Sequence, residues 1–273
     1  MSREVRIMVL TGNGINCEME TAHACRLAGA DRVDVVYLWD LCSGKAALAG
    51  YGMLCLPGGF LDGDDLGSAR ASAIRIRHTR LPGGGRLFDE FKAFAAGGGL
   101  VLGICNGFQL MVKLGLLPAV DGAVGAQQVT LTLNDSGRFE DRWVTLKADP
   151  LSPCVFTRGL DRLELPVRHG EGKLVPADDV TERVLMGRHL APLCYADPAT
   201  GEPTGKYPEN PNGSPHGIAA LTDSSGRLFG LMPHPEAFWH RTNHPRWTRT
   251  ELPEEGQGLT IFRNAVDFVR ADG

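Results

Sequence analysis

The sequence predicts an α/β fold: an open, mostly parallel sheet flanked by helices, with a small antiparallel extension. The early part of the chain contains short, continuous apolar runs, which are typical of parallel strands buried on both faces. Segments with a helical pattern alternate with these runs, as in β-loop-α-β units. Glycine supplies 35 of the 273 residues, which suits many tight turns between strands and helices. The chain has no internal repeat or low-complexity linker, so we expect one domain over residues 1–273.

The first half of the chain follows the α/β alternation. We expect strands at 5–10, 33–38, 53–56 and 100–102, and helices at 18–28, 87–96 and 108–117. Gly29 ends the first helix, because glycine adopts the left-handed conformation of a helix C-terminus at no steric cost. Segment 62–86 is rich in Asp, Arg and Gly, and we expect a surface excursion that interrupts the alternation.

The second half has a different pattern. Segments 129–133, 143–146 and 162–167 alternate or cluster as strands, and the loops between them are polar. They predict the antiparallel extension, with its loops carried toward the functional site. Segment 197–217 is a turn-rich surface excursion, after which we expect strands at 218–221 and 228–232 and a closing helix at 259–269.

The composition argues against several classes of function. The formal net charge is −4, from 28 basic and 32 acidic residues, and indicates neither a nucleic-acid partner nor a membrane surface. No apolar run could span a bilayer, and the N-terminus lacks a secretory pattern. The seven cysteines form no CxxC pair, which favours a reducing cytoplasm over a disulfide framework or a zinc site. Asp62, Asp64 and Asp65 lack histidine neighbours, so we expect a solvated face and no metal site.

Nucleotide-binding patterns are incomplete. Gly12-x-Gly14 begins a dinucleotide fingerprint, but Cys17 stands where the third glycine belongs. Gly44-Lys45 lacks both the upstream glycine and the following Ser or Thr of a P-loop. We therefore expect no nucleotide cofactor in this chain.

The stretch around Cys105 predicts a catalytic nucleophile. An apolar run ends at Gly103, Cys105 follows, and Gly107 stands two residues later at the start of a helical pattern. Small neighbours suit the strained strand-to-helix turn that carries a nucleophile in many hydrolases. The free N–H groups at the start of the helix favour the thiolate.

Two other segments supply what such a nucleophile needs. His234 and Glu236 follow an expected strand, and residues two apart in an extended segment face the same way, so the carboxylate can orient the ring. The glycine turn Pro57-Gly58-Gly59 ends another expected strand. Because ligands bind at the carboxyl ends of parallel strands, its N–H groups are placed for an oxyanion hole.

These segments resemble the class I (triad) glutamine amidotransferases, and more narrowly the glutaminase components of phosphoribosylformylglycinamidine synthases. The resemblance rests first on Gly103-Ile-Cys105-Asn-Gly107-Phe-Gln109 and Pro233-His234-Pro235-Glu236. Five further segments stand in the family's order: 14–18, 57–64, 136–140, 169–172 and 210–214.

The resemblance implies a role for each matching residue. Cys105 attacks the side-chain amide of glutamine, His234 moves the proton and Glu236 fixes the imidazole ring. The backbone N–H groups of Gly59 and Asn106 hold the oxyanion. The implied glutamine contacts are Gln109, Ser136, Arg138 and His169.

The implied reaction converts L-glutamine to glutamate and ammonia through a cysteine thioester. The ammonia would go to a separate ATP-dependent synthetase subunit of de novo purine biosynthesis, which would hold ATP and Mg²⁺, with no cofactor in this chain. Segment 239–257 exceeds what a minimal glutaminase requires and resembles the tail of the large fused synthases. A free-standing γ-glutamyl hydrolase and a non-catalytic partner module on the same fold remain as alternatives. Turnover of glutamine compared with that of a polyglutamylated substrate distinguishes the hydrolase. Loss of the Cys, His or Glu of the triad would indicate the non-catalytic module.

Overall fold

The computed structural model describes residues 4–271 and has a central sheet in the order β10-β11-β4-β3-β1-β2. All neighbouring strands in this sheet are parallel except β10, which pairs antiparallel with β11 at one edge. The strands are β1 (Arg6–Thr11), β2 (Arg32–Tyr37), β3 (Met53–Leu56), β4 (Leu100–Ile104), β10 (Ala220–Thr222) and β11 (Leu228–Leu231). The predicted open, mostly parallel sheet is confirmed.

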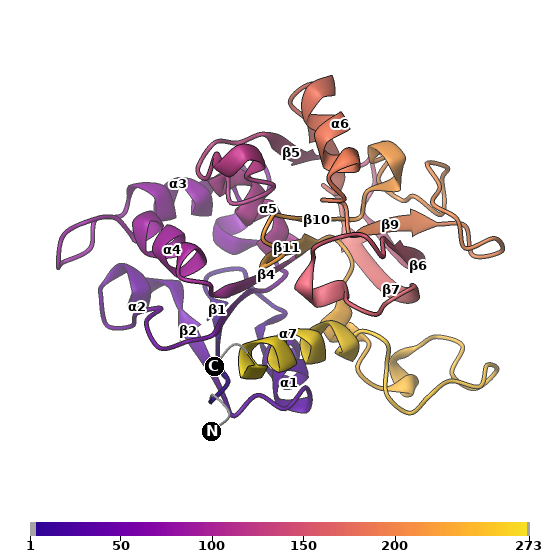
Figure 1. Cartoon of the computed structure of the whole chain (residues 1–273), viewed down its shortest axis with the longest axis horizontal. Coiled ribbons are helices and arrows are strands. Elements are labelled where there is room, and N and C mark those ends of the chain that lie inside the picture. The colour runs from indigo at the N-terminus through magenta and orange to yellow at the C-terminus, as the bar shows by residue number, and fades with distance from the viewer. Residues whose placement is uncertain (1–3, 272–273) are drawn as a thin grey trace.

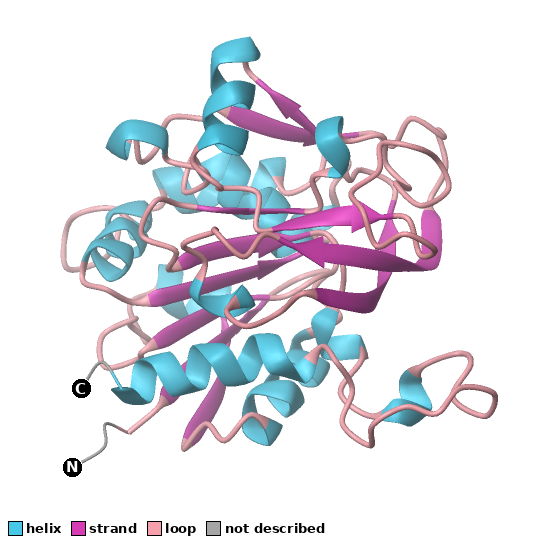
Figure 2. Ribbon diagram, turned by 45° about the vertical axis from the view of Figure 1, so that its right-hand side comes forward, coloured by secondary structure: helices cyan, strands magenta, loops and turns pink. Residues whose placement is uncertain are grey.

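Helices cover both faces of this sheet (Figures 1 and 2). They are α1 (Glu18–Leu27), α2 (Leu38–Cys42), α3 (Arg70–His78), α4 (Leu87–Ala96), α5 (Asn106–Leu114) and α7 (Leu259–Ala271). A further helix, α6 (Asp179–Gly187), packs against the antiparallel extension instead. The chain adds β2 on one side of β1 and β3 on the other, so right-handed crossovers place α1 and α4 on opposite faces. Helix α7 lies beside α1, whereas α3 packs against α4 and α5.

The antiparallel extension is confirmed as well. Strand β6 (Glu140–Ala148) lies between β7 (Arg162–His169) and β9 (Leu193–Ala196), and β5 (Val129–Thr132) pairs with β8 (Lys173–Pro176). The N–H of His234 donates to the carbonyl of Pro166 at 2.8 Å, which joins the middle of β7 to the chain that leaves the central sheet after β11.

Several elements differ from the sequence prediction. Segment 62–86 contains α3, a helix that we did not expect; only Ser72, Ala73 and Ile76 of it are buried, so its sequence has no strong apolar pattern. Helices α2 and α6 and strands β8 and β9 were also missed. Segment 197–217 is mainly turns, as expected, with one 3₁₀ turn at Pro215–Gly217.

The loops after β1 and β3 meet at the carboxyl edge of the sheet. The strand order reverses between these two strands, and ligands of open α/β sheets bind at such a reversal. Here the N–H of Phe60 donates to the carbonyl of Gly14 at 2.7 Å, and Ile15 and Gly59 form an isolated antiparallel bridge. The two loops therefore form one wall of any site at this edge.

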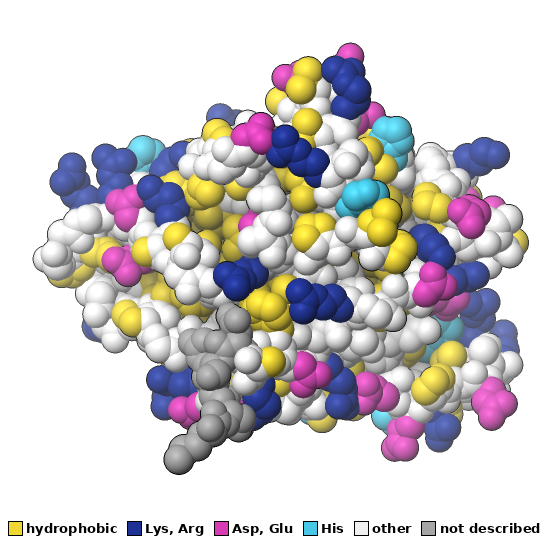
Figure 3. All heavy atoms as spheres, viewed as in Figure 1, with side chains coloured by type: hydrophobic (Ala, Val, Ile, Leu, Met, Phe, Trp, Pro, Cys, Tyr) yellow, Lys and Arg dark blue, Asp and Glu magenta, His cyan; other side chains and the backbone are white. Residues whose placement is uncertain are grey.

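The surface is mixed in charge on the face shown in Figure 3, where basic and acidic side chains alternate without a continuous patch of one sign. Between residues 4 and 271, no helix is long and apolar enough to cross a membrane.

Candidate active site

A cavity of about 330 Å³ opens at the carboxyl edge of the central sheet. Its walls come from six segments that are far apart in the sequence. The lining residues are Asn16, Cys17, Glu20, Gly59, Phe60, Asp64, Ser68, Cys105, Gln109, Phe139, Arg168, His169, Gly170, Glu171, His234, Glu236 and Ala237. Cys105, His234 and Glu236 are thus brought together on the wall of one cavity.

Cys105 stands on a strained turn between β4 and α5. Its backbone has φ 50° and ψ −102°, a conformation that L-residues rarely adopt, and its N–H donates to the carbonyl of Leu231 at 2.8 Å. The turn requires small neighbours: a Cβ on Gly103 would lie 2.8 Å from the backbone of Gly107, and a Cβ on Gly107 would overlap the carbonyl of Leu56. Helix α5 begins at the next residue, so its unpaired N–H groups lie beside the thiol.

His234 and Glu236 form a buried pair. Nδ1 of His234 lies 2.6 Å from Oε1 of Glu236, and the two residues are 2% and 1% exposed. Burial alone would lower the pKa of His234, but the Glu236 carboxylate and the thiols of Cys105 and Cys17 raise it well above its usual value. The geometric reason differs from our expectation: β11 ends at Leu231, and a 3₁₀ turn at Pro235–Ala237, rather than strand alternation, turns the carboxylate toward the ring.

The second ring nitrogen of His234 is available for proton transfer. Nε2 is buried and has no hydrogen-bond partner among residues 4–271. The Cys105 thiol donates to the carbonyl of Arg168 at 3.6 Å, a weak bond that deprotonation would release. Cys105 is also close enough to contribute to the raised pKa of His234, so the thiol and the imidazole act on each other.

Cys17 is a further thiol at this pair. Its side chain is half-buried, and burial raises the pKa of the Cys17 thiol. Donor atoms of Cys17, His234 and Glu236 lie within 4.8 Å of one another, which makes them the one group in the described chain that could hold a metal ion. The hydrogen bond between His234 and Glu236 occupies one donor atom of each residue, so the arrangement fits a catalytic pair without a metal.

Of the two residues whose backbone N–H groups are expected at the oxyanion, Gly59 lines the same cavity as Cys105 and Asn106 follows Cys105 directly. Gly59 lines the cavity with φ 141°, and a Cβ there would come within 2.7 Å of the carbonyl of Gly14, so this position requires glycine. Asn106 is the first residue of α5, where a backbone N–H has no partner within the helix.

The four expected glutamine contacts divide into two pairs. Gln109 and His169 line the cavity. Ser136 and Arg138 are not among the lining residues; Ser136 instead accepts the N–H of Arg138 at 3.4 Å within their own turn, and Phe139 of the same loop reaches the cavity.

The tautomer of His169 follows from its partner. Nδ1 lies 3.0 Å from Oδ1 of Asn134, and that oxygen also accepts the N–H of Gly172 at 3.0 Å. Nδ1 therefore carries the proton, and the buried Nε2 is an acceptor without a hydrogen-bond partner in the described part of the chain. Burial lowers the pKa of His169 to about 4, so the ring is neutral at pH 7.

The sequence did not reveal Asp64 and Glu171. We expected Asp64 on a solvated face, which is wrong: its carboxylate is half-buried and accepts the side-chain N–H of Asn106 at 3.0 Å. The carbonyl of Glu171 accepts the side-chain N–H of Gln109 at 2.6 Å. Both contacts join residues more than forty positions apart in the sequence, so no local sequence pattern predicts them. Asp62 instead forms an ion pair with Arg75 at 2.9 Å.

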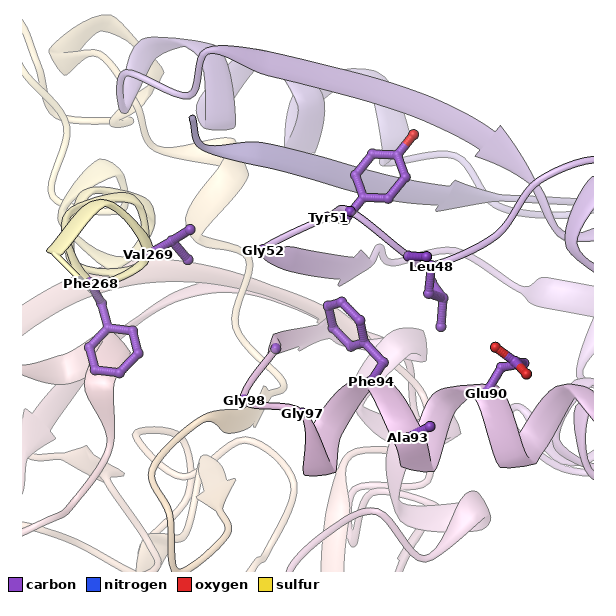
Figure 4. Close-up of a pocket in the computed structure, with 13 residues that line it drawn as sticks. Leu48, Tyr51, Gly52, Glu90, Ala93, Phe94, Gly97, Gly98, Phe268 and Val269 are labelled. Carbon is purple, nitrogen blue, oxygen red and sulfur yellow. The ribbon is translucent and has the colours of Figure 1, made fainter. Parts of the chain in front are cut away.

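A second cavity, of about 300 Å³, lies at the opposite edge of the sheet (Figure 4). Gly52 and Gly99 line it directly before β3 and β4, and Phe94 and Val269 come from α4 and α7. Its lining contains neither cysteine nor histidine. The predicted nucleophile and base, Cys105 and His234, therefore belong to the carboxyl-edge cavity, although both cavities are similar in size.

Comparison with known proteins identifies the family of the chain. Residues 4–269 match the family model of the CobB/CobQ-like glutamine amidotransferase domain. The chain is 44% identical to phosphoribosylformylglycinamidine synthase subunit PurQ of Dehalococcoides mccartyi over 269 residues, which cover 98% of each chain. It is 41% identical to phosphoribosylformylglycinamidine synthase of Drosophila melanogaster over 86% of this chain and 17% of that longer protein.

Solved structures give the same result. A chain of the PurLQS structure from Thermotoga maritima superposes with a TM-score of 0.71 at 26% identity, over 97% of this chain and 99% of that one. A glutamine amidotransferase from the same organism shares the fold with a TM-score of 0.55 at 14% identity. The chain therefore belongs to the CobB/CobQ-like glutamine amidotransferase family.

Proposed function

We propose that this chain is the glutaminase subunit of a phosphoribosylformylglycinamidine synthase, and that it supplies ammonia to a separate synthetase subunit. The observation that carries the proposal is the convergence of Cys105, His234 and Glu236 on one cavity in a chain 44% identical over its length to a PurQ subunit.

The first half-reaction breaks the amide of glutamine. His234 accepts the Cys105 proton at Nε2, and the thiolate attacks the side-chain carbonyl carbon, forming a C–S bond. The N–H groups of Gly59 and Asn106 hold the resulting oxyanion, each worth roughly 10²–10³ in rate. His234 returns the proton to the amide nitrogen, and ammonia leaves as the C–N bond breaks.

The second half-reaction releases glutamate. His234 takes a proton from water, which attacks the thioester, and the C–S bond breaks to regenerate the Cys105 thiol. Throughout, Glu236 accepts from Nδ1 and stabilises the imidazolium. Gln109 and His169 would contact the polar groups of the amino acid. This chain needs no cofactor for these steps, and ATP and Mg²⁺ would bind to the synthetase in the cytoplasm.

Ammonia release from L-glutamine, measured with and without the synthetase subunit, tests the proposal. We expect activity in the complex that Cys105→Ala abolishes and that Cys42→Ala, a change at a thiol away from the cavity, leaves intact. Equal activity in Cys105→Ala would refute the mechanism. Turnover of a γ-glutamyl peptide in preference to glutamine would instead support a γ-glutamyl hydrolase.

A further inference from the structure

The side chain of Asn106 is held on three sides beside the nucleophile. Its Oδ1 accepts the N–H of Leu61 at 3.0 Å, and its Nδ2 donates to Asp64 at 3.0 Å and to Oε1 of Gln109 at 3.0 Å. The residue is 1% exposed. The loop 60–69 is thus connected through one carboxamide to the first turn of α5, which follows Cys105 directly.

This loop has an unusual backbone. Asp62, Asp64 and Ala69 all have φ between 52° and 61°, and Gly63 and Gly67 also have positive φ. A conformation of this kind persists only where surrounding contacts determine it. Asp64 supplies two of these contacts, since Oδ1 also accepts the N–H of Ala69 at 2.9 Å.

A second connection joins the same loop to the far wall of the cavity. Oε2 of Glu171 accepts the N–H of Ser68 at 3.2 Å, while the carbonyl of Glu171 accepts from Gln109. Gln109 is therefore fixed between Asn106 and Glu171. Burial raises the pKa of the Asp64 carboxyl, and the negative charges of Glu171 and Asp65 act in the same direction. Of the three carboxylates, Asp64 is the one that contacts Asn106.

We propose that Asp64 is a positioning residue of the glutaminase reaction: by accepting from the Asn106 carboxamide, it fixes the first turn of α5 beside Cys105. It sets the direction of the Asn106 backbone N–H toward the oxyanion and holds Gln109 in the cavity. This inference rests on the proposed function, because it assigns Asp64 to the oxyanion of the glutamine reaction.

A carboxylate is needed at this position. Both Asp64 oxygens accept from Nδ2 of Asn106, Oδ2 at 3.0 Å and Oδ1 at 3.3 Å, and Oδ1 also accepts the N–H of Ala69. Asparagine would place an NH₂ group where one oxygen stands, opposite the NH₂ of Asn106, and two donors would then face each other. Asp64→Asn is therefore a nearly isosteric change that breaks the contact, and Asp65→Asn, at an exposed neighbour in the same loop, is its matched control.

Two measurements on each variant in complex with the synthetase test the role. We expect Asp64→Asn to lower kcat for ammonia release by about tenfold or more, because a backbone donor to an oxyanion is lost or misdirected. We expect the rate at which iodoacetamide alkylates Cys105 to stay within about twofold of wild type, because that displacement forms no oxyanion. Asp65→Asn should leave both rates unchanged.

A double-mutant cycle identifies the route. Asn106→Ala removes the same contact from the other side while keeping the backbone N–H, so it also tests the proposal if Asp64→Asn fails to fold. If Asp64 acts through Asn106, the double variant Asp64→Asn/Asn106→Ala loses no more activity than Asn106→Ala alone.

Three outcomes would overturn the positioning role: full activity in Asp64→Asn, losses that multiply in the double variant, or an equal fall in turnover and alkylation. The last would mean that Asp64 merely supports the fold of the turn. Absence of glutaminase activity in the wild-type complex would refute the proposed function itself. The wild-type complex is therefore assayed first, so that failure of the proposed function is distinguished from failure of the positioning role.

Discussion

Nδ1 of His234 lies 2.6 Å from Oε1 of Glu236, and the pair is almost completely shielded from solvent. A glutamine at 236 would keep the shape but could not stabilise the imidazolium. We expect Glu236→Gln to lower kcat for ammonia release by about a hundredfold or more. Activity within threefold of wild type, in the synthetase complex, would contradict the role of this carboxylate.

The same pair predicts a pH dependence of stability. The pKa of His234 is raised in the folded protein, so the pair stabilises the fold fully below the unfolded pKa of about 6.5. This stabilisation is lost as the pH rises through the higher folded pKa. Urea unfolding of wild type and Glu236→Gln should therefore give a difference in free energy that is largest near pH 6 and shrinks toward alkaline pH. A difference that grows with pH would show that the sign is wrong.

His169 should change the pH dependence of stability in the opposite direction to His234, and over a more acidic pH range. Its pKa falls to about 4 in the folded protein because the ring is buried, so the unfolded chain binds the proton first. The stability that depends on neutral His169 is present above pH 6.5 and is lost as the pH falls toward 4. We expect the free energy of unfolding of His169→Gln to vary less over this window than that of wild type. Parallel curves for the two proteins would exclude this contribution.

The strain at Cys105 predicts an inverted order of stability between two inactive variants. Alanine is usually the more stabilising residue, but at φ 50° it keeps the strain that glycine relieves. We expect Cys105→Gly to be more stable than Cys105→Ala by about 1 kcal/mol or more in urea unfolding. Both variants lack the thiol, so the comparison isolates the backbone. If Cys105→Ala is the more stable variant, the backbone at position 105 is not strained.

Gly107 is a packing requirement of the same turn. A Cβ there would overlap the carbonyl of Leu56 at the end of β3, and backbone cannot move aside as a flexible side chain does. We expect Gly107→Ala to destabilise the protein by about 2 kcal/mol or more, or to prevent folding. Gly83→Ala is the matched control, because its Cβ would meet nothing within 4 Å and its φ is not in the left-handed region. Similar melting temperatures for both variants would contradict the overlap.

The sequence predicts best where one physical cause dominates. Strand β3 and helix α4 begin and end where expected, because a continuous apolar run and an uninterrupted amphipathic pattern each specify one structure. Helix α3 was missed because an arginine-rich segment that buries only Ser72, Ala73 and Ile76 gives no such pattern. The short strands β8 and β9 are specified by their partners across the antiparallel extension rather than by their own residues.

The site divides in the same way. Cys105 and the His234–Glu236 pair could be predicted because each belongs to a compact pattern with its own chemistry. The contact between Asp64 and Asn106 could not, because it depends on how the loop after β3 folds back over α5. Ser136 and Arg138 resemble the family in sequence, yet which residue of their loop reaches the cavity is decided by the backbone of that turn.

The position of β11 also governs the order in which a ribosome-bound chain can become functional. Strand β4 lies between β3 and β11, so one of its edges stays unpaired until residues 228–231 have been synthesised. The base follows a few residues later, at position 234. Under the proposed mechanism, a growing polypeptide would therefore contain its nucleophile well before its base, and glutamine cleavage would require that the last strand of the sheet be in place.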